Sequence, residues 1–512
     1  MESSEIDIVE LGGKSLSIDE VAAVARFGAR VELSKGYIER VASCRNLLER
    51  FVEENRIIYG VTTGFGDNIS EIILEDKAAE LQRNILMTHC CSVGEPLPDE
   101  VVRASMLVML SSFGQGVSGV RVELAERIVD FLNKGITPVA PRHGSVGYLA
   151  VEAHIGLALV GIGRIKYDGK IMEASEALAK AGIGAFELSY KEGLCLTSGT
   201  TSPTALASLA LYDGLNAVAS ADVIGAISLE SLKGTMKAFD PRLMAVRPHP
   251  EQKASADNIM KLLEDSEIAR KYLDYRLQDA LSIRCIPQAH GAVRQTLKDA
   301  LRTVETELNS CCDNPIIVKD GDSGTAISGC NPDAGFVGIE ADSICIAMTY
   351  LAKMSERRTD RLVNRHLSEL PAFLVKNPGL NNGFMIAQYS AVGLLGEMKI
   401  LSHPSTVDGL PTCANQEDYV SMGYNAALKA YETSRFLEYV LSIELLTSLQ
   451  AVEFHKPLEP SSTTKAILKS VRKAVPFMES DHYIYPDIEF AKSFVHDGMV
   501  RKIAEKFTGP LI

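Results

Sequence analysis

The spacing of hydrophobic and polar positions predicts a chain built mostly of long helices. Segments rich in Ala, Leu, Gly and Ser, with few helix-breaking residues, cover residues 204–234, 335–355, 384–401 and 424–451. Small residues on such segments let helices pack closely, which favours a long-helix bundle. Strand signals are few and short, as at residues 316–318. The expected fold class is therefore all-α.

The N-terminal part carries clear signals of helix starts and of one ordered loop. Ser17 and Glu20 have the spacing of a capping box and precede an apolar run, so a helix is expected there. The stretch IIYGVTTGFGDNIS, residues 57–70, is interrupted by glycines and is typical of an ordered loop. The segment between them has apolar residues at helical spacing: Ile38, Val41, Leu48 and Phe51.

Three regions follow from these patterns. We expect an N-terminal helical and active-site-loop region over residues 1–110, a central long-helix bundle over 111–455 and a C-terminal helical cap over 456–512. No internal repeat and no low-complexity linker separates them. One continuous domain is the alternative.

Composition narrows the classes of function. The chain has 512 residues and a net charge of −14, which argues against nucleic acid or an anionic membrane as the main partner. The acidic N-terminus lacks the apolar core of a secretory signal. The most apolar long window, residues 146–164, contains Glu152 and His154, which are costly in lipid and indicate a buried helix. Ten cysteines without a CxxC pair fit a reducing cytoplasm and no metal site.

Several polar stretches lie within these helical surroundings, and each has a structural alternative. Tyr59 in YGVTTGFGDN could act as a general base if its pKa were lowered, or pack as an ordinary tyrosine. His89 lies on an apolar background, where a core histidine is the common case. Arg284 in SIRCIPQAHGA suits a carboxylate clamp as well as a structural salt bridge. Glu417, in PTCANQEDYVSMG, lies in what is otherwise a solvated turn.

Together these stretches resemble the aromatic amino acid ammonia-lyases, and the histidine ammonia-lyases most closely. The resemblance runs from about residue 57 to 490 and rests on the following segments: YGVTTGFG, RNILMTHCCSVGEPL, HGSVG, EGLCLTSGT, SIRCIPQ, CDNP, SERRTDRL, NNGFMIAQ, LSHPSTVDGLPTCANQEDYVSM and HYIYPDIE. It implies an all-helical, aspartase-like homotetramer in which several subunits build each active site. It also implies an electrophile, MIO, made by cyclising Ala-Ser-Gly.

This chain departs from the family at the electrophile. The family's Ala-Ser-Gly follows GSVG, but here Gly147 is followed at once by Tyr148, Leu149 and Ala150. Neighbouring family positions have changed too: Ser198 replaces an Asn, Leu281 replaces a Tyr, and Pro332-Asp333 replace Phe-His. We therefore expect no MIO and no other cofactor.

The resemblance assigns roles to the residues that remain. Tyr59 matches the tyrosine that removes the substrate's β-proton, and Arg284 matches the arginine that holds its carboxylate. His89 and Glu417 match positions around the ring, where Glu favours an imidazole. The expected catalytic residues are Tyr59 and Glu417, and the expected substrate-binding residues are Arg284, His89, Tyr148, Ser198, Gln416 and Asn314.

A substrate that needs no electrophile must carry a better leaving group than an amine. A quaternary trimethylammonium leaves as neutral trimethylamine, and Tyr148 could stabilise its charge by cation–π attraction or simply fill the gap. The chain is thus similar to the electrophile-free branch, the ergothionases, which eliminate trimethylamine from ergothioneine to give thiolurocanate. Candidates for ring or sulfur contacts are Lys376, Asn381, Lys399 and Asp333.

Two other functions stay open. One is elimination from histidine or hercynine, with ammonia or trimethylamine as the product. The other is a non-catalytic homologue that binds an aromatic amino acid, although the retained Tyr59, Arg284 and Glu417 argue against it.

Overall fold

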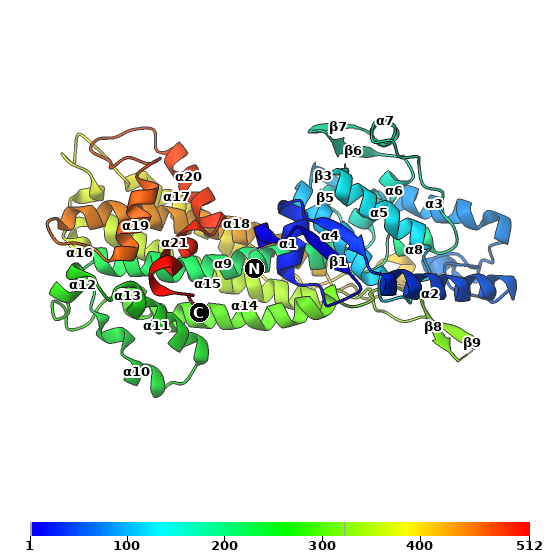
Figure 1. The fold of residues 1–512 in the computed structure, drawn as a ribbon, viewed down its shortest axis with the longest axis horizontal. Helices are drawn as coiled ribbons and strands as arrows, with labels where there is room; N and C mark the ends of the chain where they lie inside the picture. Colours follow the sequence, from blue (N-terminus) through cyan, green and yellow to red (C-terminus); the bar gives the residue numbers. More distant parts are fainter. Residues whose placement is uncertain (1–2, 322) are drawn as a thin grey trace. The chain divides into compact units, whose positions relative to one another are not determined.

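The computed structural model describes residues 3–321 and 323–512 and is mostly helical, which confirms the expected all-α class (Figure 1). Its helices are α1 (Ile18–Arg26), α2 (Lys35–Glu53), α3 (Ala78–His89), α4 (Asp99–Phe113), α5 (Val122–Lys134), α6 (Ala150–Leu159), α7 (Ala174–Lys180), α8 (Glu192–Cys195), α9 (Thr201–Ser231), α10 (Pro241–Ala245), α11 (Pro250–Leu262), α12 (Glu267–Lys271), α13 (Leu281–Arg284), α14 (Ile286–Leu308), α15 (Gly335–Val363), α16 (Arg365–Ser368), α17 (Met385–Leu401), α18 (Gly423–Val452), α19 (Ser462–Val471), α20 (Tyr485–His496) and α21 (Met499–Thr508).

Short strands pair locally in the described part of the chain and form no extended sheet. The pairs are β1 (Ile8–Leu11) with β2 (Arg30–Leu33), β3 (Val93–Pro96) with β5 (Pro141–His143), β4 (Thr137–Pro138) with β6 (Arg164–Tyr167), β6 with β7 (Lys170–Glu173), and β8 (Ile316–Asp320) with β9 (Ser323–Ile327). The β1–β2 pair is parallel and the others are antiparallel.

The hydrophobic pattern located the main helices well. The four long segments are helices α9, α15, α17 and α18, with α15 extending eight residues beyond the expected end at residue 355. Ser17 forms the predicted capping box with Glu20 at the start of α1. Ile38 lies on α2 as expected but is 36% exposed, so it is not part of the buried stripe.

The chain divides into two compact units that do not follow the three expected regions. Unit 1 comprises residues 1–212, 300–342 and 404–431, and unit 2 comprises 213–299, 343–403 and 432–512. The division falls within the long helices α9, α14, α15 and α18. The three-region division stays a prediction.

One described helix, α15, is long and apolar enough to cross a membrane by length and composition alone. Of the most apolar window of α15, 56% is buried inside the protein, as in the core helix of a soluble protein. A single helix of this kind is weak evidence for a membrane span. The window at 146–164 instead gives the ten-residue helix α6, on which Glu152 is fully buried.

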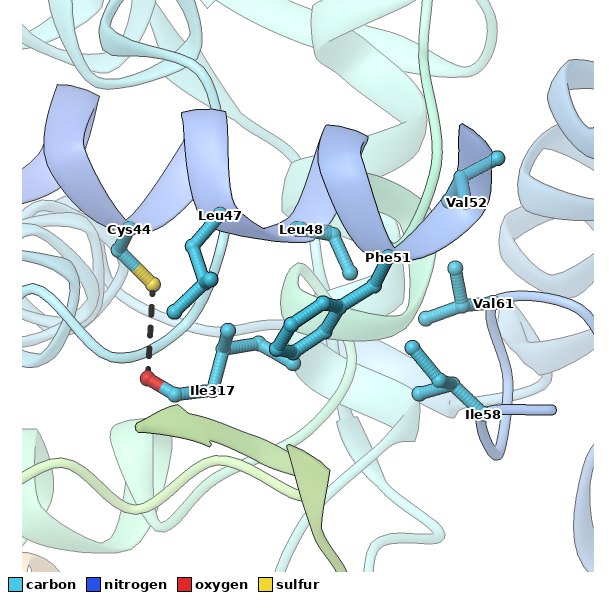
Figure 2. Packing of buried hydrophobic residues seen from close by; sticks show 8 residues of the cluster. All are labelled: Cys44, Leu47, Leu48, Phe51, Val52, Ile58, Val61 and Ile317. Carbon is cyan, nitrogen blue, oxygen red and sulfur yellow. Dashed lines mark hydrogen bonds between the residues drawn. The ribbon is translucent and has the colours of Figure 1, made fainter. Parts of the chain in front are cut away.

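Within unit 1, a small core fixes the loop that carries Tyr59. Figure 2 shows Leu48 and Phe51 of α2 packed with Ile58 and Val61, the residues on either side of Tyr59, and with Ile317 of β8. All five side chains are at most 4% exposed. The loop is therefore anchored at both flanks by buried apolar contacts.

A hydrogen-bonded bridge secures the same loop to α3 and α8. The Gln82 amide nitrogen donates to the Gly60 carbonyl at 3.0 Å, and its amide oxygen accepts from the Leu194 backbone N–H at 2.9 Å. Gly193 permits this approach, because a Cβ there would lie 2.2 Å from the Gln82 carbonyl oxygen.

We expect Gly193→Ala to lower the free energy of unfolding by about 1–3 kcal/mol, because the new methyl must displace backbone that has no room to move. The matched control is Gly184→Ala, where the methyl meets no atom within 4 Å. Urea unfolding of both variants measures the difference. Equal stability of the two would contradict the close packing of α8 on α3.

Candidate active site

Tyr59 lies half-buried at the base of its loop, with its hydroxyl engaged by backbone. The Gly66 N–H donates to the Tyr59 oxygen at 2.9 Å, and Gly66 has a left-handed φ of 55°. Burial raises the pKa of Tyr59, the Gly66 N–H opposes this, and the charges of Glu417 and Cys413 raise it further. The pKa of Tyr59 is thus raised rather than lowered in the isolated chain, and its role as a base stays a prediction.

Glu417 comes from a tight turn in the 404–431 segment of unit 1. The Thr412 hydroxyl donates to the Glu417 Oε2 at 2.9 Å, and the Thr412 N–H donates to the Glu417 carbonyl at 2.8 Å. The three residues Cys413, Ala414 and Asn415 all have left-handed φ values, between 51° and 67°. Such backbone is strained for L-residues and persists where its surroundings enforce it.

The turn that replaces the family's electrophile has a defined and unusual shape. Leu149 has φ 83° and ψ −65°, and the Ala150 N–H donates to the Tyr148 carbonyl at 3.2 Å. These values are those of the rare γ-turn with positive φ. The Ser145 hydroxyl also donates to the Tyr148 carbonyl at 3.0 Å. The shortened loop is therefore closed by specific contacts that fix the backbone of Tyr148.

Two further contacts attach this turn to the segment that carries Ser198. The Leu149 N–H donates to the Thr197 carbonyl at 3.0 Å. Glu152, in the first turn of α6, accepts the Ser202 backbone N–H at 2.8 Å, at the start of α9. Burial raises the pKa of Glu152, so its neutral form is favoured. Ser198 is 8% exposed and follows Thr197, which is bonded to Leu149, and its role toward a substrate stays a prediction.

The Glu417 carboxylate is the centre of the cluster. Burial, and then the Glu417 charge, raises the pKa of Tyr148. His89, the last residue of α3, also feels this charge: burial lowers the pKa of His89, and the Ile85 backbone and Glu417 oppose the shift. The structure therefore brings together Tyr59, His89, Tyr148 and Glu417, from four segments of unit 1.

A second carboxylate, Asp333, lies near this cluster. Burial and then the Asp333 charge raise the pKa of Tyr419. Burial, the Asp333 charge and the Glu417 charge also raise the pKa of Cys330. In the described part of unit 1, no lysine or arginine is among the groups that shift the pKa values of Tyr59, Tyr148, Cys330 and Tyr419. The local field is negative.

The remaining predicted residues are placed less directly. Gln416 is exposed on the Glu417 turn, with its N–H donating to the Cys413 carbonyl at 2.9 Å. The Asn314 side-chain oxygen accepts the Gly329 N–H at 2.9 Å and so supports the β8–β9 hairpin. Their roles toward a substrate stay predictions.

Arg284 belongs to unit 2, where it ends the short helix α13. Its Nε is buried and has no hydrogen-bond partner. A guanidinium with an unused buried donor is suited to bind an anion, because leaving such a donor unpaired is costly. Leu281 begins the same helix and is 60% exposed.

The residues at the shortened turn do not fit an MIO group. No Ala-Ser-Gly triplet follows Gly147. A Cβ at Gly147 would already lie 2.8 Å from the Ser421 Oγ.

One carboxylate–histidine group in unit 2 has the composition of a metal site. Asp213, Glu438 and His496 bring their ligand atoms within 4.8 Å of one another. Lys492 lies 3.0 Å and Arg435 3.7 Å from the Glu438 carboxylate, so side-chain cations already neutralise it. The group acts as an ion network that holds α20 to α18.

Sequence reasoning missed residues that show no motif. Thr412 orients Glu417, and Cys330 lies within the same electrostatic cluster as Asp333. Of the other candidates for ring contacts, Lys376 pairs with Glu479 and Asn381 donates to the Lys376 carbonyl, both within unit 2. Lys399 is exposed on α17.

Comparison with known proteins gives a consistent result. The family described as aromatic amino acid lyase matches residues 16–473. A histidine ammonia-lyase of Caldanaerobacter subterraneus subsp. tengcongensis is 42% identical over 97% of this chain and 98% of its own length. The crystal structure of histidine ammonia-lyase from Trypanosoma cruzi has a TM-score of 0.91 at 34% identity, covering 98% of this chain and 96% of that one.

A third similar structure is an ergothionase. The ergothioneine-degrading enzyme from Treponema denticola, in complex with desmethyl-ergothioneine sulfonic acid, has a TM-score of 0.89 at 29% identity. The match covers 96% of this chain and 99% of that one.

We expect Glu417→Gln to let Tyr59 and Tyr148 ionise at lower pH, because it removes a charge that raises both pKa values. A raised phenol pKa stabilises the folded state below pH of about 10, and this stabilisation is lost as pH rises through the folded pKa. The alkaline part of the stability curve should therefore flatten in the variant. Phenolate absorbance during alkaline titration measures the shift.

The control for this titration is Asp418→Asn, which removes the same charge from the neighbouring exposed residue. A titration of Glu417→Gln that coincides with that of Asp418→Asn would show that Glu417 does not adjoin the phenols.

Proposed function

Since the chain belongs to the aromatic amino acid lyase family and is a carbon–nitrogen lyase, we propose that it eliminates trimethylamine from ergothioneine to give thiolurocanate, without an MIO group. The observation that carries this proposal is the position of Tyr148. It stands where the family's electrophile would be, and the charges of Glu417 and Asp333 both raise the pKa of its phenol. Such a site favours a substrate group that is itself positively charged.

The leaving group decides whether an electrophile is needed. A protonated amine carries N–H protons that a base removes more readily than a C–H proton. A trimethylammonium group has no N–H proton, so a base removes the β-proton first. In the proposed step Tyr59 takes the β-proton, the C–H electrons form the new double bond, and the C–N pair leaves on nitrogen as neutral trimethylamine.

Aromatic and acidic groups together suit the trimethylammonium. A quaternary ammonium is attracted to the face of an aromatic ring and to carboxylates. Tyr59 and Tyr148 supply rings next to the Glu417 carboxylate. The same positive charge lowers the pKa of the phenols, so binding of the substrate promotes formation of the base.

The carboxylate clamp is proposed to come from another copy of the chain. Arg284 lies in unit 2, whereas Tyr59 and Glu417 lie in unit 1. Helix α17 is strongly apolar yet exposes Ile386, Tyr389 and Ile400 by 60% or more. Exposed apolar helix faces commonly form interfaces between subunits. A homotetramer with shared sites is therefore part of the proposal. A cytoplasmic location also remains a proposal.

Histidine itself is the second candidate substrate. It is favoured by the 42% identity to a histidine ammonia-lyase over nearly the whole chain. His89 and Glu417 serve an imidazole ring equally well in either case. The weakness of this candidate is that no residue at the Tyr148 turn supplies the electrophile.

The test is a paired assay with ergothioneine, hercynine and histidine, in which trimethylamine, ammonia and the ultraviolet spectrum of the acrylate product are measured. We expect trimethylamine from ergothioneine. A faster reaction of hercynine would show that ring sulfur is not required, and ammonia from histidine would overturn the proposal.

Intact mass measurement provides an independent control for the electrophile. Thr197, Ser198 and Gly199 form a triplet that ends in Ser-Gly, as the family's Ala-Ser-Gly does. Cyclisation of this triplet would remove two water molecules, so the measured mass would lie below the mass calculated from the sequence. We expect the full sequence mass and no loss of activity with borohydride.

Shared sites predict complementation between two inactive variants. Tyr59→Phe should abolish turnover while binding persists, and Arg284→Ala should strongly reduce kcat/KM. When the two variants are co-expressed equally, each site receives an intact Tyr59 with a probability of about one half and an intact Arg284 with a probability of about one half. Roughly a quarter of the sites should therefore combine both intact residues. Activity at low substrate concentration measures the recovery.

The control mixture combines Tyr59→Phe with Glu417→Gln, because these two residues adjoin within one copy. It should stay inactive. Equal recovery in both mixtures, or none in the first, would contradict a site shared between copies.

A further inference from the structure

We propose that Asp333 is a specificity-determining residue: its carboxylate, beside the Tyr148 turn and Glu417, gives the site a second fixed negative charge that selects a permanently cationic leaving group. This inference rests on the proposed function and deepens it, because it names the residue that distinguishes a trimethylammonium from an uncharged group of the same shape.

The position of Asp333 is fixed by backbone just before α15. The Asp333 Oδ1 accepts the Gly335 N–H at 2.8 Å, and the Asp333 N–H donates to the Cys330 carbonyl at 3.1 Å. The first turn of a helix also favours a negative charge, because its free N–H groups carry partial positive charge. Both effects hold the carboxylate in place.

Asp333 adjoins the turn that carries Tyr148. A Cβ built on Gly147 would lie 3.6 Å from the Ala334 Cβ, so the Gly147–Tyr148 backbone packs against the residue next to Asp333. Burial, and then the charges of Glu417, Cys330 and Asp333, raise the pKa of Tyr148. Two carboxylates therefore act on the same phenol from different segments.

The two carboxylates are held by different groups, so their effects are separable. Glu417 accepts a hydrogen bond from the Thr412 hydroxyl, whereas Asp333 accepts one from the Gly335 N–H. Removing the Asp333 charge leaves the Glu417 contacts intact. Removing one fixed charge is expected to weaken the binding of a cation by about tenfold.

The experiment compares two ligands that differ only in charge. Glycine betaine carries a trimethylammonium and a carboxylate, and tert-butylacetate has carbon in place of the quaternary nitrogen. Titration calorimetry on the assembled protein measures both affinities in the native chain, in Asp333→Asn and in Asp418→Asn. The Asn at 333 keeps an oxygen that accepts the Gly335 N–H, and thermal unfolding verifies the fold.

We expect the native protein to prefer glycine betaine. Asp333→Asn should weaken glycine betaine about tenfold and leave tert-butylacetate unchanged, whereas Asp418→Asn should change neither. Absence of a preference in the native protein, or equal weakening of both ligands in Asp333→Asn, would overturn the inference. If ergothioneine were not turned over but the Asp333-dependent preference held, only the proposed reaction would fall.

Discussion

The candidate site depends on where the Glu417 carboxylate is held. Thr412 fixes that carboxylate through a side-chain hydrogen bond, at the end of a turn with three consecutive left-handed residues. Each such residue costs roughly 1–2 kcal/mol, so the turn exists only because its surroundings enforce it. One enforcing contact is close: Gly66 has no room for a Cβ, which would lie 2.4 Å from the Cys413 Sγ. The Tyr59 loop and the Glu417 turn therefore position each other.

The shortened Tyr148 turn closes the position of the missing triplet with specific backbone contacts. A plain gap would leave a slack loop or a cavity. Instead, Leu149 adopts a γ-turn that points the chain directly into α6, and Thr197 and Ser202 hold both sides of it. Because the turn is attached to the Ser198 segment at two points, Tyr148 has a fixed place beside Glu417. This arrangement agrees better with a cation-binding role for Tyr148 than with mere filling of space.

The sequence was informative wherever local periodicity determines structure, and less so where distant segments meet. Helices α9 and α18 were located within three residues because their apolar pattern is continuous. The resemblance predicted that Tyr59 and Glu417 share a site, and in the structure the Glu417 charge acts on the pKa of Tyr59. Thr412 and Cys330 were missed because their importance arises only when separate loops fold together. The direction of the Tyr59 pKa shift was also unpredictable, since it depends on burial and on a carboxylate far away in sequence.

The raised pKa of Tyr59 opposes its use as a base in the free chain. The charge of the bound substrate removes this opposition in the proposed reaction. With Glu417 and Asp333 nearby and no cation among the groups acting on the phenols, both tyrosines hold their protons in the free chain. In the proposed reaction a bound quaternary ammonium would reverse the sign of the local field, and the Arg284 guanidinium proposed to come from another copy would add to it. The base then forms only when the leaving group is in place. A neutral ligand leaves the field negative and the tyrosine protonated, so the charge that selects the substrate also permits the proton transfer.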